Sequence, residues 1–100
     1  MAATEVDIGT MITRTPGVRG GRPHVVGAGV TVRRIIGLVY AEGLRPEKIV
    51  EEMPHLTLAG VHAALAYYHA NKARLDAEFA EEETEEARIV EEWPQAQGHT

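Results

Sequence analysis

The sequence contains no cysteine and no serine, and each absence excludes a class of chemistry. Without cysteine, the chain can form neither disulfide bonds nor cysteine-based zinc sites. Without either residue, nucleophilic catalysis would fall to threonine, lysine or tyrosine, and the sequence offers no evident general base for them. We therefore expect no enzymatic activity and no catalytic residues.

Long apolar runs and an N-terminal targeting signal are also missing. No apolar stretch approaches the roughly 20 residues that a membrane span requires. The first nine residues, MAATEVDIG, carry acidic side chains where a secretory signal would carry positive charge. These features predict a cytoplasmic protein without a membrane partner.

The chain is short and its apolar content is modest. Of its 100 residues, 44% are hydrophobic, but 14 of these are alanine. The larger apolar side chains can build only a small core, and dimerisation would bury more apolar surface. We expect one small domain that forms a homodimer.

Charge is distributed unevenly along the chain. Residues 1–50 contain seven Lys or Arg and four Asp or Glu, a net charge of +3. Residues 51–100 contain three and eleven, a net charge of −8, so that the two halves sum to −5. A basic first half and an acidic second half predict two surfaces for different partners.

Short β-strands are predicted in the first thirty residues, after a weak and flexible lead-in over residues 1–10. Residues 11–13 have β character and are followed by the turn signal Pro16-Gly17. Residues 23–26 form a second candidate strand between two glycine turns. Strands this short need a partner, so we expect them to pair with each other or with a second subunit.

Three helices are predicted in the middle of the chain. Thr31 suits the N-cap of a helix over residues 32–42, and Gly43 suits its C-terminal cap. Pro46 occupies the first position of a second, short helix, where its missing N–H costs nothing. Thr57 caps the third helix. The order of helix, short helix, tight turn and helix is typical of a helix-turn-helix.

Larger apolar side chains recur along the third helix at spacings of three and four. They are Leu58, Val61, Leu65 and Tyr68, and Leu75 and Phe79 continue the stripe. At about 100° per residue, Ala59, Gly60 and Ala63 point away from this stripe. The pattern predicts a smooth exposed face, suited either to helix packing in a dimer or to close approach of DNA.

Two blocks of sequence resemble a known bacterial family. They are PGVRGGRPHVVGAGVTVRRII and AEGLRPEKIVEEMPHLTLAGVHAALAYY. Both closely resemble the domain-of-unknown-function 433 family, whose members typically read PGVCGGRPVIxGTRIPVxxI and EGxSPEEIxxxYPxLTxxxVxAALxY. The resemblance extends over residues 11–70. Its most specific parts are PG-x-x-GG-x-P and P-x-LT-x-x-x-V-x-AAL.

The resemblance implies a small β element followed by a winged-type helix-turn-helix, usually in a dimer. Some members resemble antitoxins of the VapB type, which are encoded beside PIN-domain ribonuclease toxins. The chain departs from the family pattern at three places, none of which removes the helix-turn-helix. Arg19 replaces a frequent cysteine, Gly29-Val30-Thr31 replaces Arg-Ile-Pro, and Met53 replaces Tyr or Phe.

The expected fold is therefore α+β and mainly α. Short N-terminal strands precede a winged-helix-like helix-turn-helix, and a long or extended acidic helix follows it. We predict a lead-in over residues 1–10, a helix-turn-helix domain over 11–79 and an acidic partner-binding tail over 80–100.

Seven basic side chains precede the acidic half of the chain: Arg14, Arg19, Arg22, Arg33, Arg34, Arg45 and Lys48. Several cations within one footprint bind DNA phosphates by releasing counterions. The alternative is that they are solvated charges, or pair with Glu42 and Glu47. The expected DNA contacts are Arg19, Arg22, Arg33, Arg34, Thr57 and His62. Because base readers are typically Arg, Asn, Gln or Lys, the third helix offers little for reading bases, and Thr57 also suits a helix cap.

The C-terminal segment EEARIVEEWPQ places apolar side chains beyond an acidic run. Ile89, Val90 and Trp93 have no core partner in the local sequence, so we expect them to bind a partner together with Arg88. If that partner is a PIN-domain toxin, its metal-binding carboxylates would attract Arg88. The alternative is that the tail packs on its own subunit or on the dimer mate.

No cofactor or metal site is predicted. His55, His62 and His69 are spaced by seven residues, and imidazoles two helical turns apart cannot share an ion. The combined expectation is an antitoxin-like protein that binds its own promoter and neutralises a PIN-domain toxin. The alternatives are a stand-alone helix-turn-helix transcriptional regulator and a dimeric adaptor module that does not bind DNA.

Overall fold

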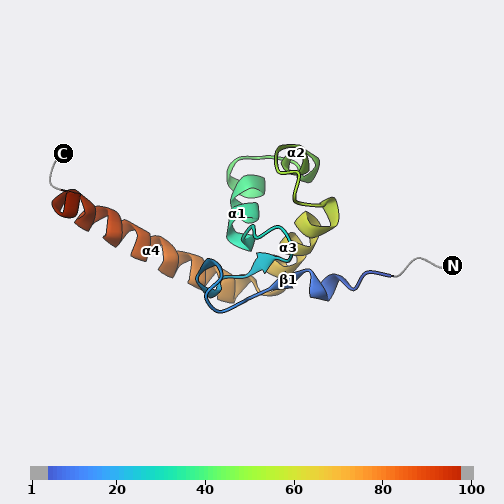
Figure 1. Ribbon diagram of the computed structural model, residues 1–100, viewed down its shortest axis with the longest axis horizontal. Coiled ribbons are helices and arrows are strands. Elements are labelled where there is room, and N and C mark those ends of the chain that lie inside the picture. The colour runs from blue at the N-terminus through green and yellow to red at the C-terminus, as the bar shows by residue number, and fades with distance from the viewer. Residues whose placement is uncertain (1–4, 98–100) are drawn as a thin grey trace. The chain divides into compact units, whose positions relative to one another are not determined.

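The computed structural model describes the backbone of residues 5–97 and the side chains of residues 5–92. The chain divides into two compact units, Met1–Ala70 and Asn71–Thr100. The first contains η1 (Ile8–Thr10), β1 (Ile12–Thr13), η2 (Arg19–Gly21), β2 (His24–Val25), α1 (Val32–Ile36), η3 (Gly37–Ala41), α2 (Pro46–Glu52) and α3 (Leu58–Ala70). The second is formed by α4 (Lys72–Gln97) (Figure 1). The predicted α+β, mainly α architecture is confirmed. The tail predicted from residue 80 begins inside α4, which continues through that point without a break.

The two predicted strands pair with each other. β1 and β2 are antiparallel, in the register Ile12 to Val25 and Thr13 to His24. β2 and the residue before it also bond to the segment that leads into α1. The N–H of Val25 donates to the carbonyl of Val30 at 2.8 Å, and the N–H of Val32 donates to the carbonyl of Pro23 at 2.9 Å. The hairpin therefore fixes where the first helix begins.

The first helix begins as predicted and ends in a π-helical turn. The hydroxyl of Thr31 accepts a hydrogen bond from the N–H of Arg34 at 3.1 Å, which is the predicted N-cap. The helix then widens, because the N–H of Glu42 donates to the carbonyl of Gly37, five residues back, at 3.0 Å. Gly43 follows with a φ of 73° and ends the helix, as predicted. The π turn has no signature in the sequence.

α2 and α3 have the predicted helix-turn-helix arrangement. Pro46 occupies the first position of α2. The hydroxyl of Thr57 accepts a hydrogen bond from the N–H of Gly60 at 3.0 Å and caps α3. α1 and α2 both pack against α3, which lies at the centre of the first unit (Figure 1).

The burial of α3 differs from the prediction. Gly60, Ala63 and Ala64 are buried, whereas Leu58 is 41% exposed. The reason is that β1 and β2 also pack on α3, and a strand with its side chains can lie close to a helix only where the helix carries small side chains. A Cβ added to Gly60 would lie 3.1 Å from Cγ1 of Val25. The prediction of an exposed face is therefore wrong for Gly60 and Ala63, which are buried within the first unit.

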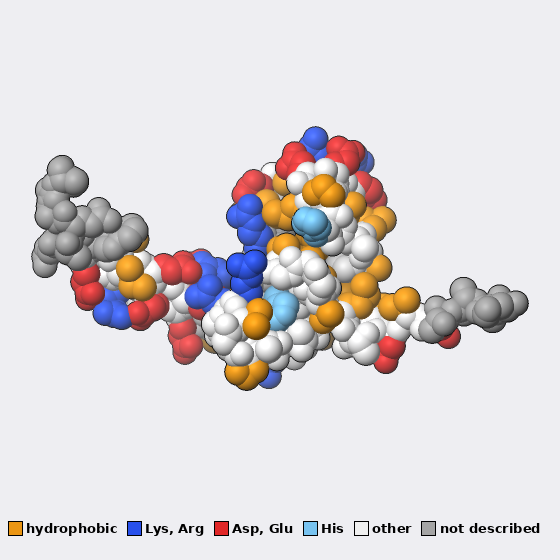
Figure 2. All heavy atoms as spheres, in the orientation of Figure 1, with side chains coloured by type: hydrophobic (Ala, Val, Ile, Leu, Met, Phe, Trp, Pro, Cys, Tyr) orange, Lys and Arg blue, Asp and Glu red, His pale blue; other side chains and the backbone are white. Residues whose placement is uncertain are grey.

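The second unit is the predicted long acidic helix. Its side chains pair one turn apart, with Lys72 Nζ 2.7 Å from Asp76 Oδ2 and Arg74 Nε 3.7 Å from Glu78 Oε2. Such exposed pairs each contribute little to stability. Acidic side chains cover much of the described part of α4 (Figure 2). Among residues 5–97, no helix combines the length and the apolar character needed to cross a membrane.

Two glycines test the packing of α3. Gly60→Ala places a methyl group 3.1 Å from Val25 Cγ1 and 3.3 Å from Thr57 Oγ1, so crowding should lower the free energy of unfolding by about 1 kcal/mol. Gly37 is also helical but has open space where a Cβ would be added. Gly37→Ala should therefore raise the free energy of unfolding by about 0.5–1 kcal/mol. Urea unfolding followed by circular dichroism measures both, and equal effects would contradict the close packing.

Candidate nucleic-acid interface

Four of the predicted DNA contacts come together around Thr31. Arg19 and Arg22 lie in or directly after η2, and Arg33 and Arg34 lie in the first turn of α1. Two neighbouring hollows in the surface both have Thr31 and Arg34 in their walls. Figure 2 shows basic side chains gathered over α1. We call the area formed by these four arginines around Thr31 the basic surface.

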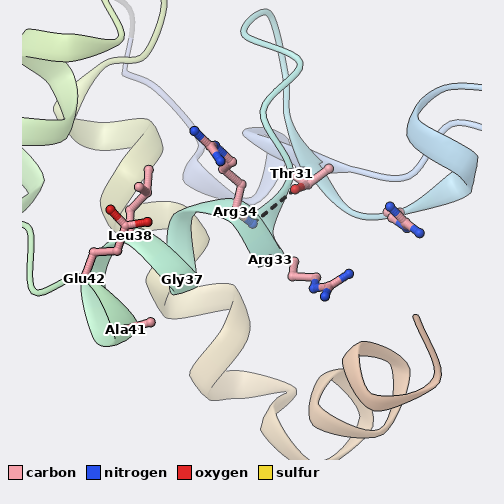
Figure 3. A pocket seen from close by; sticks show the side chains of 8 residues that line it. Thr31, Arg33, Arg34, Gly37, Leu38, Ala41 and Glu42 are labelled. Carbon is pink, nitrogen blue, oxygen red and sulfur yellow. Dashed lines mark hydrogen bonds between the residues drawn. The ribbon is translucent and has the colours of Figure 1, made fainter. Parts of the chain in front are cut away.

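The first hollow, about 320 Å³ in volume, lies along α1 and η3. Its charged lining residues are Arg22, Arg33, Arg34 and Glu42. Figure 3 shows Arg33 and Arg34 extending in different directions from the first turn of the helix, with Glu42 at the far end of the same helical segment. Within the described part of the chain, neither the guanidinium of Arg34 nor the carboxylate of Glu42 has a hydrogen-bonding or ionic partner.

Arg19 is held in place beside the second hollow, which is about 220 Å³ in volume. Its φ of 50° lies in the left-handed region, which is uncommon for a residue other than glycine. Its Nε donates a hydrogen bond to the carbonyl of Gly29 at 2.7 Å. Arg34 and Met53 line the same hollow, and Met53 is the C-terminal cap of α2. The basic surface therefore extends to the turn that precedes α3.

Thr57 and His62, the predicted DNA contacts of the third helix, line neither hollow. Both residues are exposed. The oxygen of Thr57 accepts the N–H of Gly60, while its O–H remains a possible donor. Because Gly60 and Ala63 are buried, the first turns of α3 present few groups that could read a base.

Glu42 and Met53 belong to this surface but were not among the predicted contacts. The sequence alone offers Glu42 only as an ion-pair partner for the arginines. The π turn explains why its place could not be predicted, since one additional residue in a turn rotates all following side chains by about 100°. Met53 has no charge or polar group that marks it as part of a binding site.

The predicted partner-binding residues lie on α4, and they are Arg88, Ile89, Val90 and Trp93. Ile89 is 46% exposed and Val90 is 62% exposed. The guanidinium of Arg88 pairs with Glu85, and also with Glu92 at 3.1 Å. The hydrogen bond and charge of Glu85 raise the pKa of Arg88 above its ordinary value. The side chain of Trp93 lies outside the described residues.

An aromatic cluster joins η3 to the end of α3, and nothing in the sequence predicts it. The hydroxyl of Tyr40 lies 2.7 Å from Nε2 of His69. The ring centroids of Tyr40, Tyr68 and His69 are 5.2–6.5 Å apart. In the part of the chain that the structure describes, no three His, Cys, Asp or Glu side chains form a group that could hold a metal ion.

Comparison with known proteins decides the family. A family described as "Protein of unknown function (DUF433)" matches residues 12–68, which include the whole basic surface. The chain belongs to the DUF433 family. A solved structure of a DUF433 member from Anabaena variabilis is similar, with 28% sequence identity and a TM-score of 0.62, and the match covers 70% of this chain and 68% of that chain. A comparison with proteins of curated function gives no match.

Substitution of Thr57 tests its role as a cap in this DUF433 protein. Thr57→Ala removes the acceptor for the N–H of Gly60, so we expect the free energy of unfolding to fall by about 1 kcal/mol. Thr57→Ser keeps the oxygen and should have a much smaller effect. Thermal unfolding monitored by circular dichroism compares the two. Equal losses would show that the methyl group of Thr57, and not its oxygen, stabilises α3.

Proposed function

We propose that this DUF433 member is an antitoxin-like DNA-binding protein that acts as a cytoplasmic homodimer. It binds its own promoter through the basic surface. It neutralises a PIN-domain ribonuclease toxin through the C-terminal segment of α4. It has no catalytic role and uses no cofactor.

The gathering of four arginines at one surface is the observation that supports DNA binding. Guanidinium groups hold phosphates bidentately, and the counterions released from several phosphates supply much of the affinity. Arg34 is exposed, and its guanidinium breaks no interaction with any described residue when it binds a phosphate. Arg19 is already oriented by Gly29, which reduces the conformational entropy cost of binding. Met53 connects this surface to the turn before α3, the helix that such proteins insert into the major groove.

The exposed apolar pair on α4 supports toxin binding. Ile89 and Val90 stand beside each other on a helix that is otherwise largely acidic. An apolar anchor surrounded by charge is typical of a helix that docks into a groove of a partner. Arg88 pairs with Glu85 and Glu92 at an exposed position, where ion pairs contribute little to stability. A carboxylate of the toxin can therefore replace either glutamate as the partner of Arg88.

The two alternatives are separated by simple observations. A PIN-domain reading frame beside this gene supports the antitoxin proposal, and its absence favours a stand-alone transcriptional regulator. A dimer that binds no DNA at low salt is instead an adaptor module.

Replacing two arginines tests the basic surface. Arg33→Ala/Arg34→Ala should weaken binding to a duplex of the native promoter, and should reduce the slope of log K against log salt by about 0.9 for each phosphate that the protein no longer neutralises. Lys72→Ala/Arg74→Ala removes the same charge from α4 and is the matched control. Fluorescence-anisotropy titrations at several salt concentrations measure both variants. Equal weakening by the control, or no binding by the wild-type protein at low salt, would refute this role.

Replacing the apolar pair tests the toxin-binding segment. Ile89→Gln/Val90→Gln removes two apolar anchors and no charge, so it should abolish co-purification with the neighbouring PIN-domain protein and leave promoter binding unchanged. Glu82→Gln/Glu83→Gln on the same helix should retain most of the complex. The Gln pair should also fail to inhibit the ribonuclease activity of the toxin, and deletion of residues 81–100 should have the same effect. If the Gln pair inhibits the toxin fully, the assignment of this segment is disproved.

A further inference from the structure

Glu42 carries a carboxylate in the same hollow as three arginines. It lines the first hollow with Arg22, Arg33 and Arg34. Across the described residues, the side chain of Glu42 makes no hydrogen bond or ion pair. A carboxylate repels nearby phosphates. Whatever Glu42 contributes to binding DNA must therefore come from a contact with a hydrogen-bond donor.

The geometry separates the two kinds of charge along one helical segment. Arg33 and Arg34 lie in the first turn of α1, whereas Glu42 is the C-terminal cap of η3. Glu42 follows Arg33 by nine positions, which corresponds to at most about 13.5 Å at the rise of an α-helix, because the π turn of η3 shortens the segment. Between them the hollow is lined by Gly37, Leu38 and Ala41 (Figure 3). Gly37 has no side chain and open space beside it, and Ala41 carries only a methyl group. The hollow thus offers cations at one end and an acceptor at the other.

We infer that Glu42 determines base specificity, accepting a hydrogen bond from the exocyclic amino group of a cytosine while Arg33 and Arg34 hold backbone phosphates. This inference rests on the DNA binding proposed above. Cytosine presents an amino donor alone in the major groove, and Glu accepting from it is a known base contact. Adenine places an acceptor beside its amino group, and guanine and thymine present acceptors, all of which repel a carboxylate.

The inference also accounts for where reading takes place. α3 is the usual reading helix of a helix-turn-helix, but Gly60 and Ala63 are buried against the rest of the first unit. Glu42 is the C-terminal cap of η3, which continues α1, and α1 packs against α3. Glu42 also shares its hollow with the phosphate-binding side chains. Phosphate contacts fix the register of the strand, and a base contact next to them then reads one position.

A panel of promoter duplexes, with each base pair substituted in turn, tests the inference by anisotropy. Wild-type protein should lose between about fivefold and a hundredfold in affinity when one particular C·G pair becomes T·A. Glu42→Ala should reduce that preference to about twofold or less, and should bind the substituted duplex at least as tightly as wild type does, because repulsion is removed. Glu42→Gln is nearly isosteric and should shift the preference toward adenine, whose N6 and N7 pair with an amide.

Glu47→Ala is the matched control, since it removes an equal charge from the first turn of α2, outside the hollow. It should change the affinity for all duplexes by one common factor. If Glu42→Ala does the same and the C·G preference persists, the inference is overturned while promoter binding stands. If the wild-type protein binds no duplex at low salt, the proposed function fails and the inference fails with it. Circular dichroism of each variant establishes that it is folded.

Discussion

The close packing of α3 against the β1–β2 hairpin is the contact on which the rest of the structure depends. α3 is surrounded by α1, α2 and the hairpin, so it buries side chains in more than one direction. Gly60 and Ala63 leave room for the strands, while Val61 and Tyr68 are also buried. Because β2 is bonded to the segment that starts α1, the depth at which the hairpin packs also sets the position of that helix.

Thr31 connects the hairpin and α1 to the basic surface. It forms an isolated β-bridge with His24, caps α1 through Arg34, and lines both hollows. Arg19, whose backbone is in the left-handed region, lies at the same surface and is held there by its hydrogen bond to the carbonyl of Gly29. The arrangement of the arginines is therefore a consequence of a very short hairpin and its turns, which bring together segments that are separate in the sequence.

The local features of this fold could be predicted from the sequence, and those that depend on packing could not. The caps Thr31 and Thr57, the helix end at Gly43 and the start at Pro46 were all predicted, because each depends only on neighbouring residues. The burial of α3 was not predicted correctly. Apolar periodicity identifies the buried face of a helix by its large side chains, whereas the close approach of a strand requires small ones.

In the candidate site, too, the residue types could be predicted from the sequence, whereas their arrangement in space could not. The arginines could be named from the sequence because their chemistry suits phosphate wherever they lie. Their convergence on Thr31, and the presence of Glu42 in the same hollow, depend on the hairpin and on the π turn of η3. The sequence contains no signal for the π turn, so the direction of Glu42 could not be worked out from residue spacing.

The contact between Tyr40 and His69 links η3 to the end of α3. A tyrosine hydroxyl can both donate and accept a hydrogen bond. When Nε2 of His69 is bare, the hydroxyl donates to it, and when that nitrogen carries a proton, the hydroxyl accepts. The direction of the bond reverses but its partners stay the same. The two helical segments are thus joined by a hydrogen bond that either tautomer of the imidazole can make, so their spacing there does not depend on which ring nitrogen carries the hydrogen.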